Sequence, residues 1–350
     1  MDINPSDPHR PRRRCPTCDA SDRTILTAVP PETFVYCNPT IDIERLRRSG
    51  LLDLPPISLA RCNGCRTVAT TAALSVEHSA TFWDTVVDDS RSFDKIFSIE
   101  KRRRNADRWA TALNALASTP TWSGGNARPV RVLDFGCGWG DFLSAAESPG
   151  VECVGVEVHP VKIASARDRG LTILETLDDL PSDFRFDILH CDQVLEHLDD
   201  PAGVLSSLSK LAAPDMVAYL AVPNYSDTRV DRAVASIELG KPLDDKDLIT
   251  WDHLNFFSGE TFGRLVEGAG WAAVVDPASP GRLSHRTSTW AVPGAAHRSA
   301  SSASARRRRR LRPRDWFGSL RRGGTPPTGR KDVASTGRKD VASTVRSDAA

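Results

Sequence analysis

Three glycines at alternate positions follow an apolar run that ends in an acidic residue. The stretch is VRVLDFGCGWGDFL, and its glycines are Gly136, Gly138 and Gly140. Glycine lets the backbone take a positive φ and approach a ligand closely. A turn of this kind after a parallel strand is typical of a nucleotide-type cofactor site. Dinucleotide sites use G-x-G-x-x-G, whose third glycine would replace Asp141 here, so the spacing favours a cofactor without a pyrophosphate.

Two carboxylates accompany these glycines. Asp134 lies two residues before the first glycine, where its negative charge favours a nearby sulfonium and amino group. Glu157 ends the next apolar run, VECVGVEV, where a carboxylate can accept hydrogen bonds from both ribose hydroxyls. Dinucleotide enzymes use the same ribose contact, so the glycine spacing, and not Glu157, separates the two classes of cofactor.

Four of the eight cysteines form two C-x2-C pairs. CPTC contains Cys15 and Cys18, and CNGC contains Cys62 and Cys65. Four thiolates delivered by two tight turns suit tetrahedral Zn²⁺, so the pattern predicts a structural zinc site. The 43 intervening residues exceed the usual ribbon spacing. The alternatives are four ordinary buried thiols, or a site that has lost its metal.

Two histidines and one glutamate are candidates for proton transfer. Glu196 and His197 lie in VLEHL, and His253 lies in WDHLNFF. Histidine suits a general base because its ordinary pKa lies near neutrality. For Glu196 and His197 three roles stay open: acid-base chemistry, metal binding, and a structural role in which they cap a helix that starts near Asp200 and brace the cofactor loop. His253 either belongs to a lid over the acceptor or is a buried side chain bonded to a backbone carbonyl.

The elements that position these residues follow from the apolar patterns. From Val130 onward short apolar runs alternate with helical stretches, which indicates a parallel sheet covered by helices on both faces. SGETFGRLVEGAG has an S-x-x-T start and a glycine stop, and WAAVV and STWAV are candidates for closing antiparallel strands. The expected fold class is α/β, a Rossmann-like parallel sheet with an antiparallel closing strand and a small N-terminal zinc-ribbon-like module. The predicted parallel strands are VRVLDF, VECVGVEV, LTIL, FDILHC and MVAYLAVP.

Composition divides the chain into five segments. The C-terminal one is rich in Ala, Ser, Arg and Gly and contains TGRKDVAS twice, and so short a polar repeat buries too little surface to fold. Residues from Phe82 to about Leu116 have helical periodicity. We expect a disordered N-terminus over 1–14, the zinc-ribbon-like module over 15–75, a helical segment and linker over 76–128, the sheet domain over 129–293 and a disordered basic tail over 294–350.

Charge is unevenly distributed along the 350 residues. Residues 298–350 contain 15 Lys or Arg and 4 Asp or Glu, whereas residues 1–297 contain 31 Lys or Arg and 41 Asp or Glu. An acidic body argues against a large nucleic-acid footprint. The run RRRRRLRPR with the neighbouring Trp316 and Phe317 is either a solvated tail or a site for nucleic acid or anionic lipid. Since no apolar run is long enough to span a bilayer and no signal peptide is recognisable, we expect a cytoplasmic protein. The sequence does not determine its oligomeric state.

An ordered set of motifs from Arg131 to Trp271 resembles the class I S-adenosylmethionine-dependent methyltransferases. The motifs are LDFGCGWGDFL, GVEVHP, FDILHCDQVLEHLDDP, AVPN and DHLNFFSGETFGRLVEGAGW. The resemblance implies that the methionine portion of S-adenosylmethionine lies at Asp134, Gly136 and Gly138, its ribose at Glu157, and its adenine near Leu177 and Asp178.

Two further resemblances concern the acceptor. VLEHLDDP resembles a segment of quinone-biosynthesis O-methyltransferases in which E-x-x-E-H is associated with a divalent metal. Gln193 stands in place of the first glutamate, and an amide is a poorer ligand for a hard cation. The N-terminal part together with the core resembles bacterial enzymes that methylate sugars and related metabolites, without the long C-terminal domain of the sugar C-methyltransferases.

We therefore expect an enzyme that transfers a methyl group from S-adenosylmethionine to a small-molecule acceptor, a hydroxyl of a sugar or secondary metabolite. Alignment of the two reactants supplies much of the rate of such a displacement. Two alternatives stay open: an RNA methyltransferase that uses the zinc module and the basic tail, and a cofactor-binding scaffold without turnover. Nucleic acid is the less favoured partner.

Overall fold

The computed structural model describes residues 7–36, 42–83, 98–119, 128–241, 243, 251–274 and 286–293. The predicted basic tail, with its arginine run and its repeats, lies outside these ranges. So do residues 84–97, which form the middle of the segment expected to be one helix from Phe82 to about Leu116. Within the described part, helix α2 (Val76–Thr81) ends before Phe82, and helix α4 (Ile99–Ala117) accounts for the second half of the expected helix.

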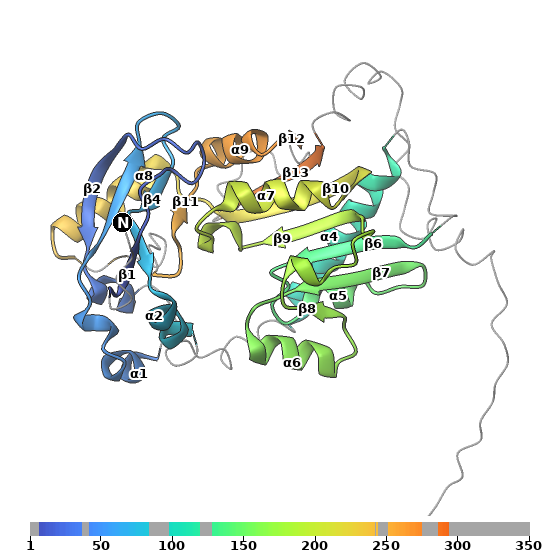
Figure 1. The fold of residues 1–350 in the computed structure, drawn as a ribbon, viewed down its shortest axis with the longest axis horizontal. Coiled ribbons are helices and arrows are strands. Elements are labelled where there is room, and N and C mark those ends of the chain that lie inside the picture. Colours follow the sequence, from blue (N-terminus) through green and yellow to red (C-terminus); the bar gives the residue numbers. More distant parts are fainter. Residues whose placement is uncertain are drawn as a thin grey trace, which may run out of the picture. The chain divides into compact units, whose positions relative to one another are not determined.

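Seven strands form the larger sheet, in the order β12, β13, β10, β9, β6, β7, β8 (Figure 1). The strands from β10 to β8 are parallel to their neighbours, whereas β13 is antiparallel to both β10 and β12. The expected Rossmann-like sheet with an antiparallel closing strand is therefore confirmed. The strands are β6 (Val130–Phe135), β7 (Val151–Val156), β8 (Ile173–Leu174), β9 (Phe186–Asp192), β10 (Ala212–Pro223), β12 (Trp271–Val274) and β13 (Arg286–Pro293).

The side chains of β9 show how the two faces of this sheet are covered. Alternate residues of a strand point to opposite faces. Leu189 and Cys191 belong to an apolar core that includes residues of helices α7 and α9, while His190 stacks on Phe142 of helix α5. Helices α7 and α9 pack together, as do α4 and α5 (Figure 1). The helices are α5 (Asp141–Ala146), α6 (Pro160–Asp168), α7 (Pro201–Lys210) and α9 (Gly259–Gly268), the last with the expected start at Ser258 and Thr261.

A four-stranded antiparallel sheet combines the N-terminal module with a distant segment. Its order is β11, β4, β3, β2, and β11 (Asn255–Phe256) pairs with β4 (Val68–Thr70). An uncovered edge strand exposes unpaired backbone groups, and β11 covers that edge of β4. The sequence interpretation confined this module to residues 15–75, whereas its sheet also contains residues 255 and 256. The other two strands are β2 (Arg23–Val29) and β3 (Ile57–Cys62).

The expectation of disorder over residues 1–14 is wrong for the described residues 7–14. Strand β1 (His9–Pro11) pairs with β5 (Ala72–Leu74) in a two-stranded antiparallel sheet. Arg12 follows it and is buried. A buried guanidinium is tolerated only when it is paired, and Arg12 has several partners. The pattern of prolines and arginines in the sequence did not reveal these partners.

A second apolar core joins the N-terminal module to the segment that follows β10. Helix α8 (Asp227–Glu238) contributes Val230 and Ala233, and the neighbouring segments contribute Tyr225 and Trp251. None of the helices in the described ranges is both long and apolar enough to cross a membrane. The N-terminal members of this core are Val29, Leu46, Leu51, Ile57, Leu59, Val68, Leu74 and Phe82. Leu46 belongs to helix α1 (Ile43–Arg48) and Leu51 to the 3-10 helix η2 (Leu51–Asp53), which contacts the 3-10 helix η1 (Pro31–Tyr36).

Candidate active site

The glycine turn, residues 136–140, connects β6 to α5. Gly136, Gly138 and Gly140 all have positive φ, at 72°, 55° and 75°. A β-carbon at Gly136 would collide with the Val194 side chain, and one at Gly140 would meet the end of the Leu171 side chain. The positive φ at both positions also favours glycine. A β-carbon at Gly138 would have no neighbour within 4 Å. Gly138 is therefore the glycine that borders open space, where a ligand can approach the backbone.

Glu157 holds the glycine turn against the end of β7. Its Oε2 accepts a hydrogen bond from the Gly138 N–H at 2.8 Å, and its Oε1 accepts from Val158 and His159 at 2.8 and 2.9 Å. A carboxylate has about four acceptor positions. Three backbone donors leave capacity for a further donor, such as a ribose hydroxyl.

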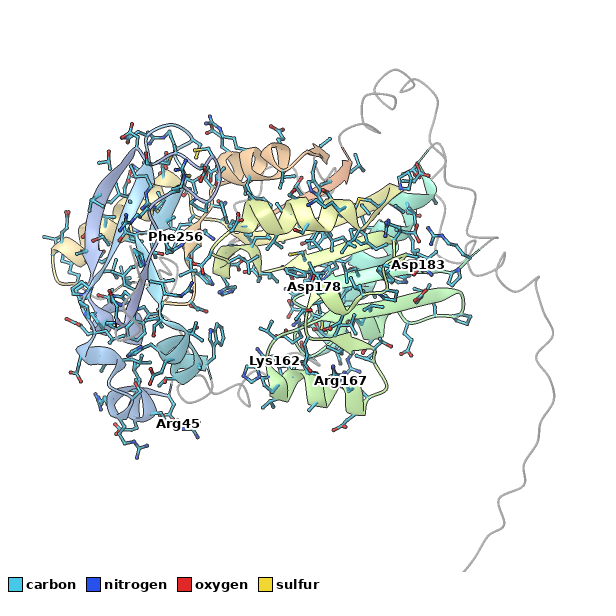
Figure 2. All side chains as sticks on the ribbon, viewed as in Figure 1. Arg45, Lys162, Arg167, Asp178, Asp183 and Phe256 are labelled. Atoms are coloured by element: carbon cyan, nitrogen blue, oxygen red, sulfur yellow. The ribbon has the colours of Figure 1, made fainter. Side chains whose placement is uncertain are left out.

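Leu177 and Asp178 lie in the short 3-10 helix η4 (Leu177–Asp179) that follows β8. The hydroxyl of Thr176 caps this turn and accepts a hydrogen bond from the Asp178 N–H at 3.1 Å. Asp178 is exposed and is labelled in Figure 2. Because β6, β7 and β8 are parallel, the glycine turn, Glu157 and η4 all follow carboxyl ends at one edge of the sheet, where α/β proteins bind ligands.

Asp134 is buried within the sheet. Its Oδ1 lies 2.7 Å from Nδ1 of His190 on the neighbouring strand, and the His190 ring stacks on Phe142 and Tyr219. Burial raises the pKa of Asp134, and His190 opposes that shift. With only 2% of the residue exposed, the carboxylate is occupied by a protein partner. Its expected contact with the cofactor stays a prediction.

Helix α4 directs a polar face toward the glycine turn. Lys101, Asn105 and Arg108 are spaced i, i+4, i+7 on that face. The first two contact the carboxylate of Asp141 at 3.1 and 2.7 Å, and Arg108 lies 2.7 Å from Asp192 at the end of β9. Sequence reasoning missed these residues, although the i, i+4, i+7 spacing of polar groups in a helix was a visible signal.

The acid-base cluster consists of Glu196, His197 and His253. Glu196 and His197 lie in the 3-10 helix η5 (Leu195–His197) after β9, and His253 precedes β11. One possible ligand atom from each residue lies within 4.8 Å of the others. His197 Nε2 is 3.7 Å from Glu196 Oε1, and the two imidazole centroids are 4.7 Å apart. The structure thus brings together all three sequence candidates for proton transfer.

A backbone contact determines which nitrogen of His197 is available. Its Nδ1 lies 2.9 Å from the carbonyl oxygen of Asp252, an acceptor, so Nδ1 carries the hydrogen and donates it. Neutral His197 therefore has its lone pair on Nε2. The side chain is 27% exposed, which lets Nε2 accept a proton from a bound molecule.

Glu196 is fully buried and its two oxygens accept no hydrogen bond from any residue described. Burial raises its pKa to about 7, and His197 opposes the shift. A buried carboxyl group without donors is costly, and such groups are typical of functional sites. His253 bonds through Nδ1 to the Tyr225 hydroxyl at 2.8 Å, and burial lowers its pKa to about 4.

Two sequence alternatives for this cluster are wrong. Helix α7 is capped by Asp200, whose carboxylate accepts from the Gly203 N–H at 2.8 Å, so neither Glu196 nor His197 is the cap. Of the two histidines, His197 is the one bonded to a backbone carbonyl, whereas His253 bonds to the Tyr225 hydroxyl. The two histidine contacts join residues 55 and 28 positions apart, which local patterns do not determine.

Trp83 lies beside the acid-base cluster and was not a sequence candidate. Its ring is edge-on to His197, with centroids 6.1 Å apart. Nζ of Lys162, labelled on α6 in Figure 2, lies 5.8 Å from the centroid of Trp83. An aromatic ring and a cation next to the exposed side of His197 can bind a planar or anionic part of an acceptor.

The four predicted metal ligands converge. Sγ of Cys15 is 3.4 Å from that of Cys65, Sγ of Cys18 is 3.5 Å from that of Cys62, and all four lie within 4.8 Å of one another. Sulfurs bound tetrahedrally at about 2.3 Å from zinc would be about 3.8 Å apart, so the group fits this ion. Burial alone would raise the pKa of Cys62, but N–H donors of Cys65 and Gly64 and the Cys18 thiol lower it to about 7.

The strand order, the glycine turn and Glu157 at the end of β7 are together those of class I S-adenosylmethionine-dependent methyltransferases. The chain belongs to the methyltransferase domain family, which matches residues 100–275, half of its length.

Several known proteins are similar to this chain. Ubiquinone biosynthesis O-methyltransferases from Haemophilus ducreyi and Hahella chejuensis are 35% identical over 107 residues and 30% identical over 104. Each match covers 27% of this chain and 45% or 43% of the relative, so the chain spans about half the length of the curated relatives it matches.

Solved structures are similar at lower identity. The plantazolicin methyltransferase BamL has 13% identity and a TM-score of 0.45, over 62% of this chain and 94% of its own. Magnesium protoporphyrin IX methyltransferase from Synechocystis PCC 6803 has 16% identity and a TM-score of 0.41, and the match covers 63% of this chain and 100% of that protein's chain.

Proposed function

We propose that this protein transfers a methyl group from S-adenosylmethionine to a hydroxyl group of a small molecule, such as a sugar or a secondary metabolite. The observation that carries the proposal is the pairing of His197 Nε2, available as a base, with the buried carboxyl group of Glu196, which accepts no hydrogen bond from the residues that the structure describes. The pair lies close to the glycine turn, because Val194 of the preceding segment packs against Gly136.

The cofactor would occupy the open space at Gly138. When bound, S-adenosylmethionine supplies a methyl carbon that its sulfonium activates. Glu157 would accept hydrogen bonds from the ribose hydroxyls while it keeps the glycine turn in place. Asp134 and Gly136 are proposed to shape the methionine end of the site, and Leu177 and Asp178 its adenine end.

His197 would act on the acceptor. Its Nε2 takes the proton from the acceptor hydroxyl, whose oxygen bonds to the methyl carbon while the pair of electrons of the broken carbon–sulfur bond goes to sulfur. When ionised, which its pKa of about 7 allows from neutral pH upward, Glu196 stabilises the resulting imidazolium from 3.7 Å away. His253 stays neutral near pH 7, since its pKa is about 4, and so adds no positive charge beside it.

The same three residues support a second role, the binding of a divalent metal ion. One nitrogen from each imidazole and one carboxylate oxygen lie within 4.8 Å of one another. Two histidines and one carboxylate are a common set of ligands for transition metals. Titration of the zinc-loaded protein with Mn²⁺ would separate the roles: a metal role predicts binding that His253→Gln abolishes, and proton transfer alone predicts none.

We propose that the four cysteines hold a structural zinc ion. Bound zinc would join the CPTC turn to the CNGC turn at the end of β3 and so stabilise the N-terminal module. Four cysteines that ligate zinc must stay reduced, which suits a reducing compartment, and for this reason we propose a cytoplasmic location.

Calorimetry with S-adenosylhomocysteine tests the cofactor site. We expect binding by the wild-type protein and a loss of at least tenfold in affinity in Glu157→Ala, because the ribose contact and the anchor of Gly138 are both removed. Glu152→Ala is the matched control: Glu152 lies on the same strand, half-buried, and contacts Arg131 at 2.9 Å. Failure of the wild-type protein to bind would overturn the proposal.

The acceptor can be found by mass spectrometry. Metabolites of cells with and without the protein are compared for a mass increase of one methyl group in place of one hydrogen. Incubation with RNA of the same cells tests the competing acceptor, and methylated RNA without any methylated metabolite would overturn the small-molecule proposal.

A further inference from the structure

Arg12 of the N-terminal module reaches into the segment that carries His253. Its Nη1 donates to the Leu254 carbonyl at 2.8 Å, and its Nη2 donates to Oδ1 of Asn255 at 2.7 Å. The side chain is only 7% exposed, and it also contacts Thr70 of β4 and Asp199. Burial lowers the pKa of Arg12 to about 10, so the guanidinium keeps its charge at neutral pH.

Asn255 connects Arg12 to the η5 turn, which carries Glu196 and His197. It is completely buried. Its Nδ2 donates to the carbonyl oxygens of Leu198 at 2.8 Å and Leu195 at 3.1 Å, and lies 3.4 Å from that of Glu196. The Leu254 N–H adds a hydrogen bond of 2.8 Å to the Glu196 carbonyl. One side chain thus binds the backbone of the whole turn.

The turn needs such a restraint. A single 3-10 turn has poor internal hydrogen bonds. Gln193, just before it, has φ of +63°, a conformation that costs energy outside glycine and persists only where its surroundings determine it. Glu196 in the turn is buried and has no hydrogen-bond donor in the part of the chain that the structure describes, which also favours displacement of the turn.

We propose that Arg12 and Asn255 are positioning residues that hold the η5 turn in the geometry that places His197 Nε2 beside Glu196. The N-terminal module then contributes to methyl transfer without touching the cofactor. This inference rests on the proposed function of His197.

Asn255→Asp is the sharpest test. The aspartate keeps an oxygen for Arg12 but loses the Nδ2 donors to the turn, at almost unchanged volume. We expect hydrogen exchange in the peptide spanning residues 193–199 to be about tenfold faster than in the wild-type protein. Zinc content and the affinity for S-adenosylhomocysteine should stay within twofold of wild type.

If Asn255→Asp folds poorly, Arg12→Lys provides a second test. Lysine keeps the positive charge but cannot reproduce the two guanidinium hydrogen bonds, to the Leu254 carbonyl and to Asn255. We expect faster exchange at the same turn. Arg10→Gln is the control: it removes a cation two residues away that also contacts Asp199, at 2.7 Å, but does not reach Asn255. It should leave exchange at the turn unchanged.

Kinetics with the acceptor found by mass spectrometry supply the second readout. We expect kcat of Asn255→Asp to fall about tenfold with an unchanged KM for S-adenosylmethionine. Wild-type exchange at residues 193–199 in both variants would overturn this inference while leaving the proposed function intact. A wild-type protein without methyl transfer would overturn the proposed function, and the exchange experiment would still decide whether the link holds the turn.

Discussion

The glycine turn and the acid-base cluster lie close together but are built in opposite ways. The turn comes from five consecutive residues, and its nearest partner, Glu157, follows the adjacent strand. The cluster takes Glu196 and His197 from the end of β9 and His253 from a segment 56 residues further along, supported by Arg12. A contiguous turn is specified by local conformation, whereas the cluster exists only when three distant segments of the chain meet.

Their polar groups differ in the same way. Glu157 has three backbone donors, so the glycine turn is nearly satisfied by the protein alone. Glu196 has no donor within the described ranges and a pKa near 7. The difference fits the proposed roles, a preformed turn for the cofactor and a cluster whose remaining interactions would be made with the reacting molecule.

The largest expected effect concerns the zinc ion proposed for the four cysteines of the N-terminal module. Removal of zinc, or Cys15→Ser, should lower the free energy of unfolding by several kcal/mol, since structural zinc contributes about 10 kcal/mol or more in isolated modules. Thermal unfolding and metal analysis measure this effect. Cys153→Ser, on β7, is the control. A Cys15→Ser protein with wild-type stability and zinc content would exclude the metal site.

The next effect separates chemistry from binding. His197→Gln should lower kcat by about 10² to 10⁴-fold, because the base is lost, with the affinity for S-adenosylhomocysteine unchanged. Steady-state kinetics and calorimetry give the two quantities. His78→Gln replaces a histidine of α2 that bonds to Ser75 and should be neutral. Equal losses of turnover and of cofactor binding in His197→Gln would mean that the two regions are not separate.

A third effect is the pH dependence of stability. Folded Glu196 holds its proton up to about pH 7, whereas the unfolded side chain releases it near its ordinary value of 4.5. Between these values the folded state binds more protons, so the free energy of unfolding should fall as pH rises, by about 3 kcal/mol in total from this group. Glu196→Gln should remove that fall in urea titrations across the window, and an unchanged slope would show that Glu196 is ionised in the folded protein.

The smallest effect concerns the glycine turn. Gly138→Ala places a methyl group in the open space and should weaken S-adenosylhomocysteine binding about tenfold, with a loss of about 1 kcal/mol of stability from its positive φ. Gly170→Ala is matched, because Gly170 has φ of +86° and also no atom within 4 Å of its β-carbon position. If both variants bind as tightly as wild type, the ligand does not lie against Gly138.

Much of the fold was predictable because its signals are local. The alternation of apolar runs and helical stretches indicated the sheet, and four cysteines at C-x2-C spacing indicated one cluster. Boundaries were less accurate. Strand β10 begins at Ala212 instead of Met216, because Ala212 pairs with Phe186 across the sheet, a contact that no local pattern reports.

The candidate site was predictable in its members but not in its arrangement. His197 and His253 were recognised by residue type and motif, yet their roles depended on partners far along the chain, the Asp252 carbonyl and the Tyr225 hydroxyl. Arg12 lay in a segment interpreted as disordered, and Asn255 was not a candidate.

The sequence by itself determined the strand-glycine-helix turn, the carboxylate after the second strand and the cysteine pairs, because backbone conformation and short spacings depend on neighbouring residues. Only the tertiary structure decided that Glu196 is buried without a donor among the described residues and that Arg12 meets Leu254, 242 residues away. Burial and long-range pairing change pKa values and hold catalytic geometry, and both arise only when distant segments pack together.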